Sequence, residues 1–334
     1  MSRAAQLALG LVVSALCLWL AMNDVRPAEV LQALRQANYL GFVALVALTV
    51  AGFWLRALRW RWLFAGERPI RQGALFSATM IGFMANNLLP LRLGEFVRAW
   101  ALGRREGLSK ATVFATVVVE RVVDMIALIV VLGVALWVHP LTEGSDATRL
   151  VRRGATLLIA GGVILTLGVI VLERWPAAAH ALVGWLTRSL PERPRRRAAV
   201  MLDHFVEGLA LFRDLPRLAW VFLLSFLMFG VVALGLTVSL WAFGIETPWY
   251  AGLVMLVITA IGIMVPAAPG YIGTMNVACK VGLRLFGVGP ELSVPFSWFY
   301  WAGQWLPVTL VGLYYLRREG LSLASLGRVQ DESA

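Results

Sequence analysis

The sequence is poor in the residues that build metal centres and soluble active sites. It has 2 cysteines, both inside apolar runs, and 3 histidines that lie far apart: Cys17, Cys279, His139, His180 and His204. Disulfide frameworks and metal sites need clustered ligands, so we expect no metal and no other cofactor. The chain also lacks a phosphate-binding loop of the G-x-x-x-x-G-K-S/T type and a nucleophile elbow. Catalysis of the kind found in soluble enzymes therefore has no support, and we expect the protein not to be an enzyme.

Charged residues are also scarce. Only 15% of the 334 residues are charged, 60% are hydrophobic, and the mean hydropathy is +0.77. Several uncharged runs approach the roughly 20 residues that cross a bilayer, and a soluble protein would not leave so many. The net charge of +11 is more typical of basic cytoplasmic loops beside anionic lipid than of nucleic-acid binding. We therefore predict a single membrane domain, residues 1–334, with no nucleic-acid partner.

Apolar runs predict about six membrane spans, at residues 4–22, 40–58, 111–138, 154–172, 217–243 and 296–316. The first run is longer than a signal-peptide core and lacks a clear small-residue cleavage site, so we expect it to be retained. Arginine and lysine concentrate in segments 56–71, 104–110, 174–197 and 317–328. Basic loops stay in the cytoplasm, which predicts a multi-pass protein of the inner (cytoplasmic) membrane with both termini cytoplasmic. The 139–153 loop is an exception, because it also carries three arginines.

Two further apolar regions, 73–102 and 249–287, are each broken by a polar, proline-containing motif. The first contains NNLLPLRLGEFVR from Asn86, and the second contains VPAAPGYIGT from Val265. Broken backbone survives at membrane depth only inside protein or beside a wet cavity. Basic loops flank 73–102, so it should enter from the cytoplasm, whereas poorly basic loops flank 249–287, so it should enter from outside. We predict two oppositely oriented re-entrant helical hairpins in an inverted repeat. Kinked full spans are the alternative.

This arrangement divides the chain into two halves and a linker. Residues 1–172 form the first half, 173–216 a cytoplasmic linker, and 217–334 the second half. Within the linker, apolar residues recur at steps of three or four, at Met201, Phe205, Leu209 and Phe212. That pattern predicts an amphipathic helix on the membrane surface. We interpret it as a lipid-anchored linker, with capture of acidic headgroups as the alternative.

Charged residues inside apolar segments are the strongest functional signal. Arg92, Glu95 and Arg98 recur every three residues, which places them on one face of a helix. They could form a self-satisfied stripe of ion pairs at the membrane edge. They could equally form a cradle in which arginine binds a lipid phosphate and Glu95 holds the arginine, because the planar guanidinium can contact two phosphate oxygens.

The run VVVERVVDMIAL, residues 117–128, carries further charges. Glu120 and Asp124 lie one turn apart, and Arg121 should point about 100° away. A charge at a span centre costs roughly 2.5 kcal/mol or more, so these residues should not face lipid. We expect structural pairing with Arg92 or Arg98, because buried charges need partners. A proton relay through either carboxylate is the alternative.

The proline breaks expose helix ends that can attract an anion such as a phosphate headgroup. Simple tight turns are the alternative, in which Gly270 and Gly273 serve only steric needs. The candidate substrate-binding residues are Asn86, Asn87, Pro90, Arg92, Gly94, Glu95, Arg98, Glu120, Arg121, Asp124, Pro266, Pro269, Gly270, Gly273 and Asn276.

Four motifs carry a resemblance to a known family. They are LRALRWRWLF with Arg56 and Arg59, NNLLPLRLGEFVRAW at 86–100, VVVERVVDMIAL at 117–128, and PAAPGYIGT at 266–274 followed by Gly287. On these motifs the chain resembles the flippase-like membrane family related to the transmembrane region of lysylphosphatidylglycerol synthetases, some members of which are associated with hopanoid biosynthesis. The resemblance covers essentially the whole chain. The GE-x-x-R and ER-x-x-D pair is fairly specific, whereas the PG-x-x-G turn alone is weak.

The resemblance implies lipid translocation between leaflets. The family pattern falls on Asn87, Pro90, Arg92, Gly94 and Glu95, and its second charged motif falls on Glu120, Arg121 and Asp124. Many members carry a glutamate after the Pro-Gly turn, where this chain has Asn276, so an acid role at that position stays open. The soluble aminoacyl-transfer domain of the larger synthetases does not follow here, so we do not expect lysyl-lipid synthesis.

The sequence therefore predicts an all-α integral membrane protein with about six spans and two re-entrant hairpins. Its predicted function is to translocate or carry a phosphate-bearing lipid between the leaflets of the inner membrane, with membrane lipids as its partners. One alternative is a membrane-embedded enzyme acting on a lipid phosphate, against which the lack of a dense His/Asp/Ser cluster argues. Another is a non-catalytic partner of a lipid-modifying enzyme complex.

Overall fold

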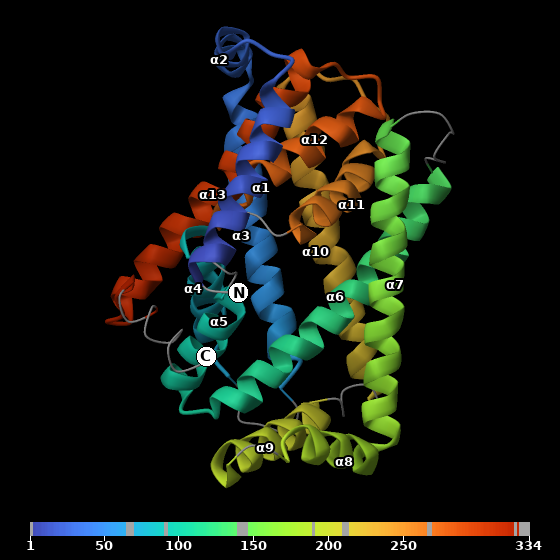
Figure 1. Ribbon diagram of the computed structural model, residues 1–334. Helices are drawn as coiled ribbons and strands as arrows, with labels where there is room; N and C mark the ends of the chain where they lie inside the picture. The colour runs from blue at the N-terminus through green and yellow to red at the C-terminus, as the bar shows by residue number, and fades with distance from the viewer. Residues whose placement is uncertain are drawn as a thin grey trace.

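The computed structural model describes residues 3–64, 70–89, 93–138, 146–188, 191–208, 214–265, 269–323 and 326, and the regular structure within them is helical (Figure 1). The all-α prediction is confirmed. The elements are α1 (Arg3–Met22), α2 (Pro27–Gln36), α3 (Tyr39–Arg61), α4 (Gln72–Leu88), α5 (Gly94–Glu106), α6 (Lys110–Val138), α7 (Asp146–Arg174), α8 (Pro176–Leu186), α9 (Glu192–Gly208), α10 (Leu215–Ala242), α11 (Ala251–Met264), the 3₁₀ turn η3 (Pro269–Tyr271), α12 (Thr274–Arg284) and α13 (Pro290–Arg318).

Each predicted span coincides with a helix, namely α1, α3, α6, α7, α10 or α13. By length and composition, α3, α10 and residues 148–168 of α7 could cross a membrane, as could residues 11–22 and α2 taken together across their 75° bend. Helix α6 is long enough but carries three charged residues near its middle. Two details differ from the prediction. Helix α2 was not predicted, and α7 begins at Asp146, so the three arginines assigned to the 139–153 loop lie in its first turns.

The two broken regions form pairs of short helices. Helices α4 and α5 have 17 and 13 residues, and α11 and α12 have 14 and 11. At 1.5 Å per residue, none reaches the roughly 30 Å thickness of the hydrocarbon. Glycine lets the two helices of each pair approach closely. A Cβ on Gly82 would lie 2.7 Å from the Cβ of Arg98, and one on Gly262 would lie 2.5 Å from the Cβ of Ala278.

Three helix boundaries of the first half recur in the second half at one constant spacing. The first residues of α5 and α12, Gly94 and Thr274, lie 180 residues apart, as do both the first and the last residues of α6 and α13. Helix α10 is the counterpart of α3, and the two contact each other in antiparallel orientation (Figure 1). The amide of Asn38 donates to the carbonyl of Ala242, 2.8 Å away, at one end of the pair. At the other end, Nε of Arg217 donates to the carbonyl of Trp62, 2.6 Å away.

The tips of the two helix pairs meet inside the protein. A Cβ on Gly270 in η3 would lie 3.5 Å from the carbonyl oxygen of Asn87 at the end of α4, and 2.8 Å from Nε1 of Trp305 in α13. The φ angle of Gly270 is 76°, a conformation that favours glycine. Nε1 of Trp301 donates to the carbonyl of Gly270 at 2.7 Å. A larger residue at position 270 would therefore collide with Trp305 of α13.

Helices α8 and α9 lie across one end of the molecule, where α9 packs against α6 (Figure 1). The predicted linker helix is present as α9, which contains Met201 and Phe205. Leu209 and Phe212 lie outside the described residues. A contact of 3.1 Å between Nε2 of His180 and Oδ1 of Asp203 joins α8 to α9. That α9 is anchored on lipid stays a prediction.

Candidate functional site

Charged side chains from three helices converge inside the protein. We call them the ion cluster, and they are Arg56 and Arg59 of α3, Glu95 and Arg98 of α5, and Glu120, Arg121 and Asp124 of α6. The arginines of α3 lie three positions apart, so they share one face of that helix. Glu120 and Asp124 lie one turn apart on α6 and face them.

Glu120 is the centre of the ion cluster. Its Oε1 accepts contacts of 2.9–3.1 Å from Arg121, Arg56 and Arg59. Its Oε2 lies 2.8 Å from Nη2 of Arg98. The carboxylate is fully buried. A buried carboxylate needs this much compensation, because taking an ion out of water costs several kcal/mol.

Asp124 is the second anchor of the cluster. It pairs with Nη1 of Arg59, and its Oδ2 lies 3.1 Å from Arg56 and 3.4 Å from Arg121. Nη1 of Arg59 also donates to Oγ of Ser225, 2.7 Å away on α10. The cluster therefore connects α3 and α6 to the second half of the protein.

Arg98 is held by an aromatic ring as well as by charge. Its guanidinium lies 3.6 Å from the ring centre of Trp60, whose Nε1 donates to Oγ1 of Thr116 at 2.9 Å. Such a cation–π contact can contribute about 2 kcal/mol when water is excluded. Arg98 is fully buried, and among the described residues its Nε and Nη1 have no hydrogen-bond acceptor. Within the described residues, Arg98 thus retains unused donor capacity.

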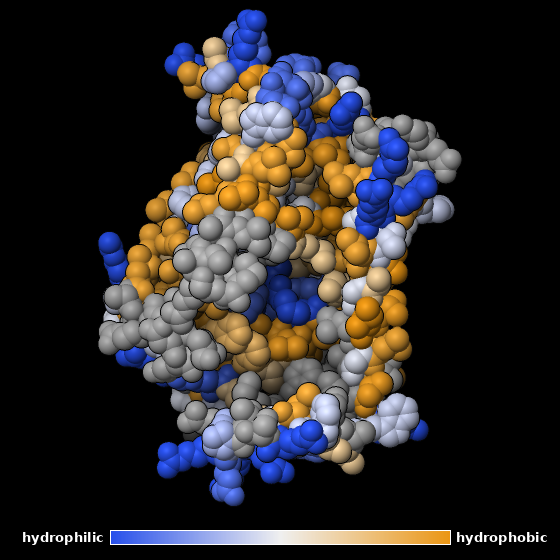
Figure 2. Space-filling view, in the orientation of Figure 1, coloured by the Kyte–Doolittle hydropathy of each residue, from blue (hydrophilic) through white to orange (hydrophobic). Residues whose placement is uncertain are grey.

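The described part of the ion cluster has four guanidinium groups and three carboxylates, which leaves one excess positive charge. Arg121 is the most exposed member at 38%, and its Nη1 lies 3.8 Å from Oε1 of Glu95, which is 25% exposed. Arg56 and Asp124 are partly exposed, whereas Arg59 and Arg98 are buried. Figure 2 shows hydrophilic atoms recessed at the centre of an otherwise largely apolar face. The cluster is therefore open along one edge and could accept an anion there.

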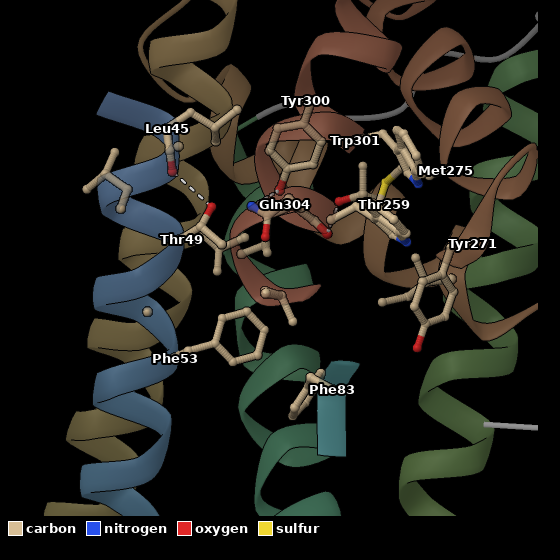
Figure 3. Close-up of a pocket in the computed structure, with 18 of the residues that line it drawn as sticks. Leu45, Thr49, Phe53, Phe83, Thr259, Tyr271, Met275, Tyr300, Trp301 and Gln304 are labelled. Carbon is tan, nitrogen blue, oxygen red and sulfur yellow. Dashed lines mark hydrogen bonds between the residues drawn. The ribbon is translucent and has the colours of Figure 1, made fainter. Parts of the chain in front are cut away.

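A cavity of about 240 Å³ lies between the tips of the two helix pairs, and Arg56 contributes to its wall together with Asn87 and Gly270. The other lining groups are mostly apolar and aromatic (Figure 3). Two polar side chains of the wall are bonded within the protein. Oγ1 of Thr49 donates to the carbonyl of Leu45 at 2.9 Å, and Nε2 of Gln304 donates to the hydroxyl of Tyr300 at 3.3 Å. The cavity therefore presents a mainly apolar surface that meets the ion cluster at Arg56.

The 180-residue repeat relates this cavity to the ion cluster. Glu120, Arg121 and Asp124 of α6 correspond to Tyr300, Trp301 and Gln304 of α13, and all three of these line the cavity. The second half thus places uncharged side chains where the first half places its charged ones.

Comparison with known proteins assigns the chain to a family. Residues 7–312 match the family described as the lysylphosphatidylglycerol synthase TM region. The chain belongs to this family. The resemblance seen in the sequence motifs is thereby confirmed, and the chain is a member of a membrane family related to lipids.

Three curated relatives match the chain. Two are UPF0104 membrane proteins of Methanothermobacter thermautotrophicus, one 26% identical over 80% of this chain and 82% of the relative, the other 22% identical over 83% and 81%. The third is glycosyltransferase AglD of Haloferax volcanii, 27% identical over 81% of this chain but only 47% of AglD. No solved structure matches the chain.

The structure brings five predicted site residues together, namely Glu95, Arg98, Glu120, Arg121 and Asp124. The expected pairing of Arg98 with an acid of the 117–128 run is confirmed. The expected direction of Arg121 is wrong, because its long side chain turns back to contact both Glu120 and Asp124. Helix α5 begins at Gly94, so of the predicted three-residue helical face only Glu95 and Arg98 lie on α5.

The asparagines and glycines of the two proline-containing motifs lie outside the ion cluster. Asn86 accepts a 2.7 Å hydrogen bond from the amide of Gly94 and so links α4 to α5. Asn276 is buried, accepts from the amide of Gly273 at 3.1 Å and donates to Ser297 at 2.8 Å, so it closes the turn of the second pair. Asn87 and Gly270 line the cavity, and Pro269 begins η3. Pro90, Arg92 and Pro266 lie outside the described residues.

Sequence reasoning missed Arg56 and Arg59 as site residues. The positive-inside pattern assigned them to a cytoplasmic loop, but they lie in the last turns of α3 and pair with Glu120 and Asp124. A usable signal was present. Two arginines on one helix face at the end of an apolar run complement two carboxylates on one face of another helix.

Proposed function

We propose that the protein moves a phosphate-bearing lipid between the two leaflets of the membrane. The observation that carries this proposal is the ion cluster, which has an excess positive charge and one open edge inside an apolar protein. Arginine suits a phosphate because its planar fork can bind two oxygens with charge-assisted hydrogen bonds. Charged residues kept at such cost within membrane segments generally serve a substrate or ion pathway. Membership of a lipid-related membrane family supports the same substrate class.

The arrangement of the helices supports alternating access. We propose that α4–α5 and α11–α12 are re-entrant hairpins that enter from opposite faces and meet at Asn87 and Gly270. The antiparallel contact of α3 with α10 and the 180-residue repeat of helix boundaries support an inverted repeat. Carriers with this symmetry place the substrate where the two repeats meet. The remaining long helices, α1, α3, α6, α7, α10 and α13, would then be the six spans, with both termini cytoplasmic.

The site offers a charged environment to the phosphate of the substrate and an apolar environment to its hydrocarbon. We propose that the phosphate contacts Arg121 and Arg56 at the open edge of the ion cluster, while hydrocarbon enters the apolar cavity beside Arg56. The uncharged wall at Tyr300, Trp301 and Gln304 offers no comparable attraction to an anion. A headgroup that passes from the charged half to the neutral half would therefore be released more easily on that side.

We propose that this transfer involves no covalent chemistry. The carboxylates of the cluster are engaged by guanidinium groups, which suits electrostatic binding better than proton abstraction. The glycosyltransferase activity in the name of one relative belongs to a protein of which this chain matches only 47%, so that activity is not carried over.

The test is exchange of a labelled phospholipid between leaflets of proteoliposomes. Arg121→Gln should slow exchange at least about tenfold, because it removes a charge-assisted contact. Its guanidinium is partly exposed, and Arg56, Arg59 and Arg98 still neutralise Glu120, so the variant should elute as a folded protein. Arg61→Gln, which removes an exposed arginine from the last turn of α3, is the matched control and should exchange lipid like wild type.

Two results would decide against parts of this proposal. Wild-type protein that exchanges phosphatidylglycerol, phosphatidylethanolamine and phosphatidylcholine no faster than empty liposomes would refute translocation. Exchange that persists unchanged in Arg121→Gln would keep translocation but remove Arg121 from the binding site. Arg121→Lys should recover only part of the rate, because lysine keeps the charge and loses the fork.

A further inference from the structure

A second, separate pocket lies where α4 begins and where α5 and α13 end. Its volume is about 440 Å³, and it shares no lining residue with the ion cluster or with the cavity between the tips of the two helix pairs. Its lining residues are Gly73, Ala101, Arg104, Arg105, Tyr315, Arg318, Glu319 and Leu321. Three of these eight residues are arginines.

The one carboxylate in the wall of this pocket is already engaged. Glu319 accepts hydrogen bonds from the hydroxyl of Ser77 and from Nη1 of Arg105. Arg105 also lies 4.0 Å from Oε1 of Glu106. Arg105 is therefore neutralised, and its contact with Glu319 fastens the base of the α4–α5 pair to the end of α13.

Within the described residues, the other two arginines have no such compensation. Arg104 lies 5.6 Å from the ring centre of Trp100, and Nη1 of Arg318 donates to the hydroxyl of Tyr314 at 3.4 Å. Both are exposed, and neither forms an ion pair with a residue in the described part of the chain. The three arginines and one glutamate of the wall thus leave two excess positive charges. An aromatic side chain lies beside each of these two guanidinium groups.

The start of α4 adds to this positive potential. Gly73 is in the first turn of α4 and lines the pocket, and the N-cap residue Arg71 makes no side-chain capping bond. The first amides of a helix lack intrahelical partners and attract anions. The pocket therefore combines two guanidinium groups that form no ion pair within the described residues with the positive end of a 17-residue helix.

We infer that this pocket binds a phosphate group through Arg104 and Arg318. Arginine forks fit phosphate oxygens, and basic pockets between helices on the cytoplasmic side of a membrane bind anionic headgroups. A phosphate here bridges α5 to α13 and so reinforces the contact that Glu319 makes. The phosphate can come from an anionic lipid of the cytoplasmic leaflet or from a soluble phosphate compound, and the experiment separates the two. The inference does not depend on lipid translocation.

The experiment counts bound lipid by native mass spectrometry of the full chain with phosphatidylglycerol or phosphatidylcholine. The variant is Arg104→Gln/Arg318→Gln. The control is Arg188→Gln, because Arg188 is an exposed arginine that lies 5.2 Å from the ring centre of Trp185, outside the pocket. In a parallel arm, the shift in melting temperature with inorganic phosphate is measured for the same proteins.

We expect wild type and Arg188→Gln to retain one more phosphatidylglycerol than the double variant, with affinity at that site reduced about tenfold or more by the two substitutions. Phosphatidylcholine should show a smaller difference. If inorganic phosphate stabilises wild type and control but not the double variant, the site is assigned to a soluble phosphate. Equal lipid retention and equal phosphate response in the double variant and in Arg188→Gln would overturn the inference. Leaflet exchange is not a readout here, so the two proposals fail independently.

Discussion

Replacing Glu120 by glutamine gives the sharpest test of how the ion cluster is held together. Glutamine keeps the shape of the side chain and removes its charge. Four guanidinium groups contact the Glu120 carboxylate at 2.8–3.1 Å. After the substitution they retain only Asp124 and Glu95 as counterions, so the described cluster gains a second excess positive charge. The cluster should then be destabilised by charge repulsion as well as by lost hydrogen bonds.

The size of the effect follows from burial. Removing one partner of a buried ion pair typically costs about 3–5 kcal/mol, because the other partner is left uncompensated. Asp124 still contacts Arg56 and Arg59, so we expect a value near the lower end, about 3 kcal/mol. For a chain of 334 residues, that corresponds to a fall in melting temperature on the order of 4 °C. Arg121→Gln should cost no more than about 1 kcal/mol, since Arg121 is partly exposed.

The measurement is unfolding of the purified protein in detergent, for Glu120→Gln, Arg98→Gln and the double variant. Removing both charges should cost about 1–3 kcal/mol less than the sum of the single effects, because the groups are in direct contact at 2.8 Å. Additive effects, or a Glu120→Gln protein as stable as wild type, would refute the pairing. A loss of stability in Arg121→Gln equal to that in Glu120→Gln would show that exposure does not decide the cost.

Three further predictions concern the two helix pairs. Gly94→Ala should abolish folded protein in size-exclusion chromatography, because its Cβ would lie 2.1 Å from the carbonyl oxygen of Gly82, whereas Gly73→Ala, with no atom within 4 Å of the added Cβ, should elute normally. Asn276→Ala should lower the free energy of unfolding by about 1–3 kcal/mol, because it removes the hydrogen bonds to Gly273 and Ser297. It should leave leaflet exchange unchanged. A selective loss of exchange would instead place Asn276 in the substrate site. In protein without Cys17 and Cys279, single cysteines at Ser109→Cys and Val288→Cys should react with impermeant reagents from opposite sides of the membrane, and labelling from one side would contradict the inverted repeat.

The long elements of the fold could be predicted from the sequence, because their signal is local. Each of the six apolar runs coincides with a helix, and the proline motifs mark the breaks between α4 and α5 and between α11 and α12. Helix α2 escaped prediction because its ten residues mix polar and apolar types without a long hydrophobic run. The start of α7 was also missed, because the arginines of its first turns resemble a loop by composition alone.

The candidate site was predictable only in part, because its assembly depends on contacts between distant segments. The acids of the 117–128 run and Arg98 were predicted to pair, since buried charges need partners, and they do. The spacing of Arg56 and Arg59 on one helix face was a local signal for a charged site, but pairing them with Glu120 and Asp124 needed the orientation of α3 relative to α6. The contact of Arg121 with Glu120 could not be predicted either, because helix geometry fixes the Cα–Cβ direction but not the path of a long side chain. Helices α6 and α13 begin and end 180 residues apart, but their sequences do not reveal this correspondence. Charged residues of α6 stand where α13 has neutral ones, so only the helix boundaries show it.

The most direct test of lipid binding at the ion cluster is a cryo-electron microscopy map of the protein in nanodiscs that contain phosphatidylglycerol. We predict headgroup density within hydrogen-bonding distance of Arg121 and Arg56, with a chain that continues into the cavity lined by Tyr300 and Gln304. The Arg121→Gln protein should show the same fold without that density. A well-resolved wild-type map with lipid only around the outer surface, and with the open edge of the ion cluster occupied by protein alone, would contradict the account.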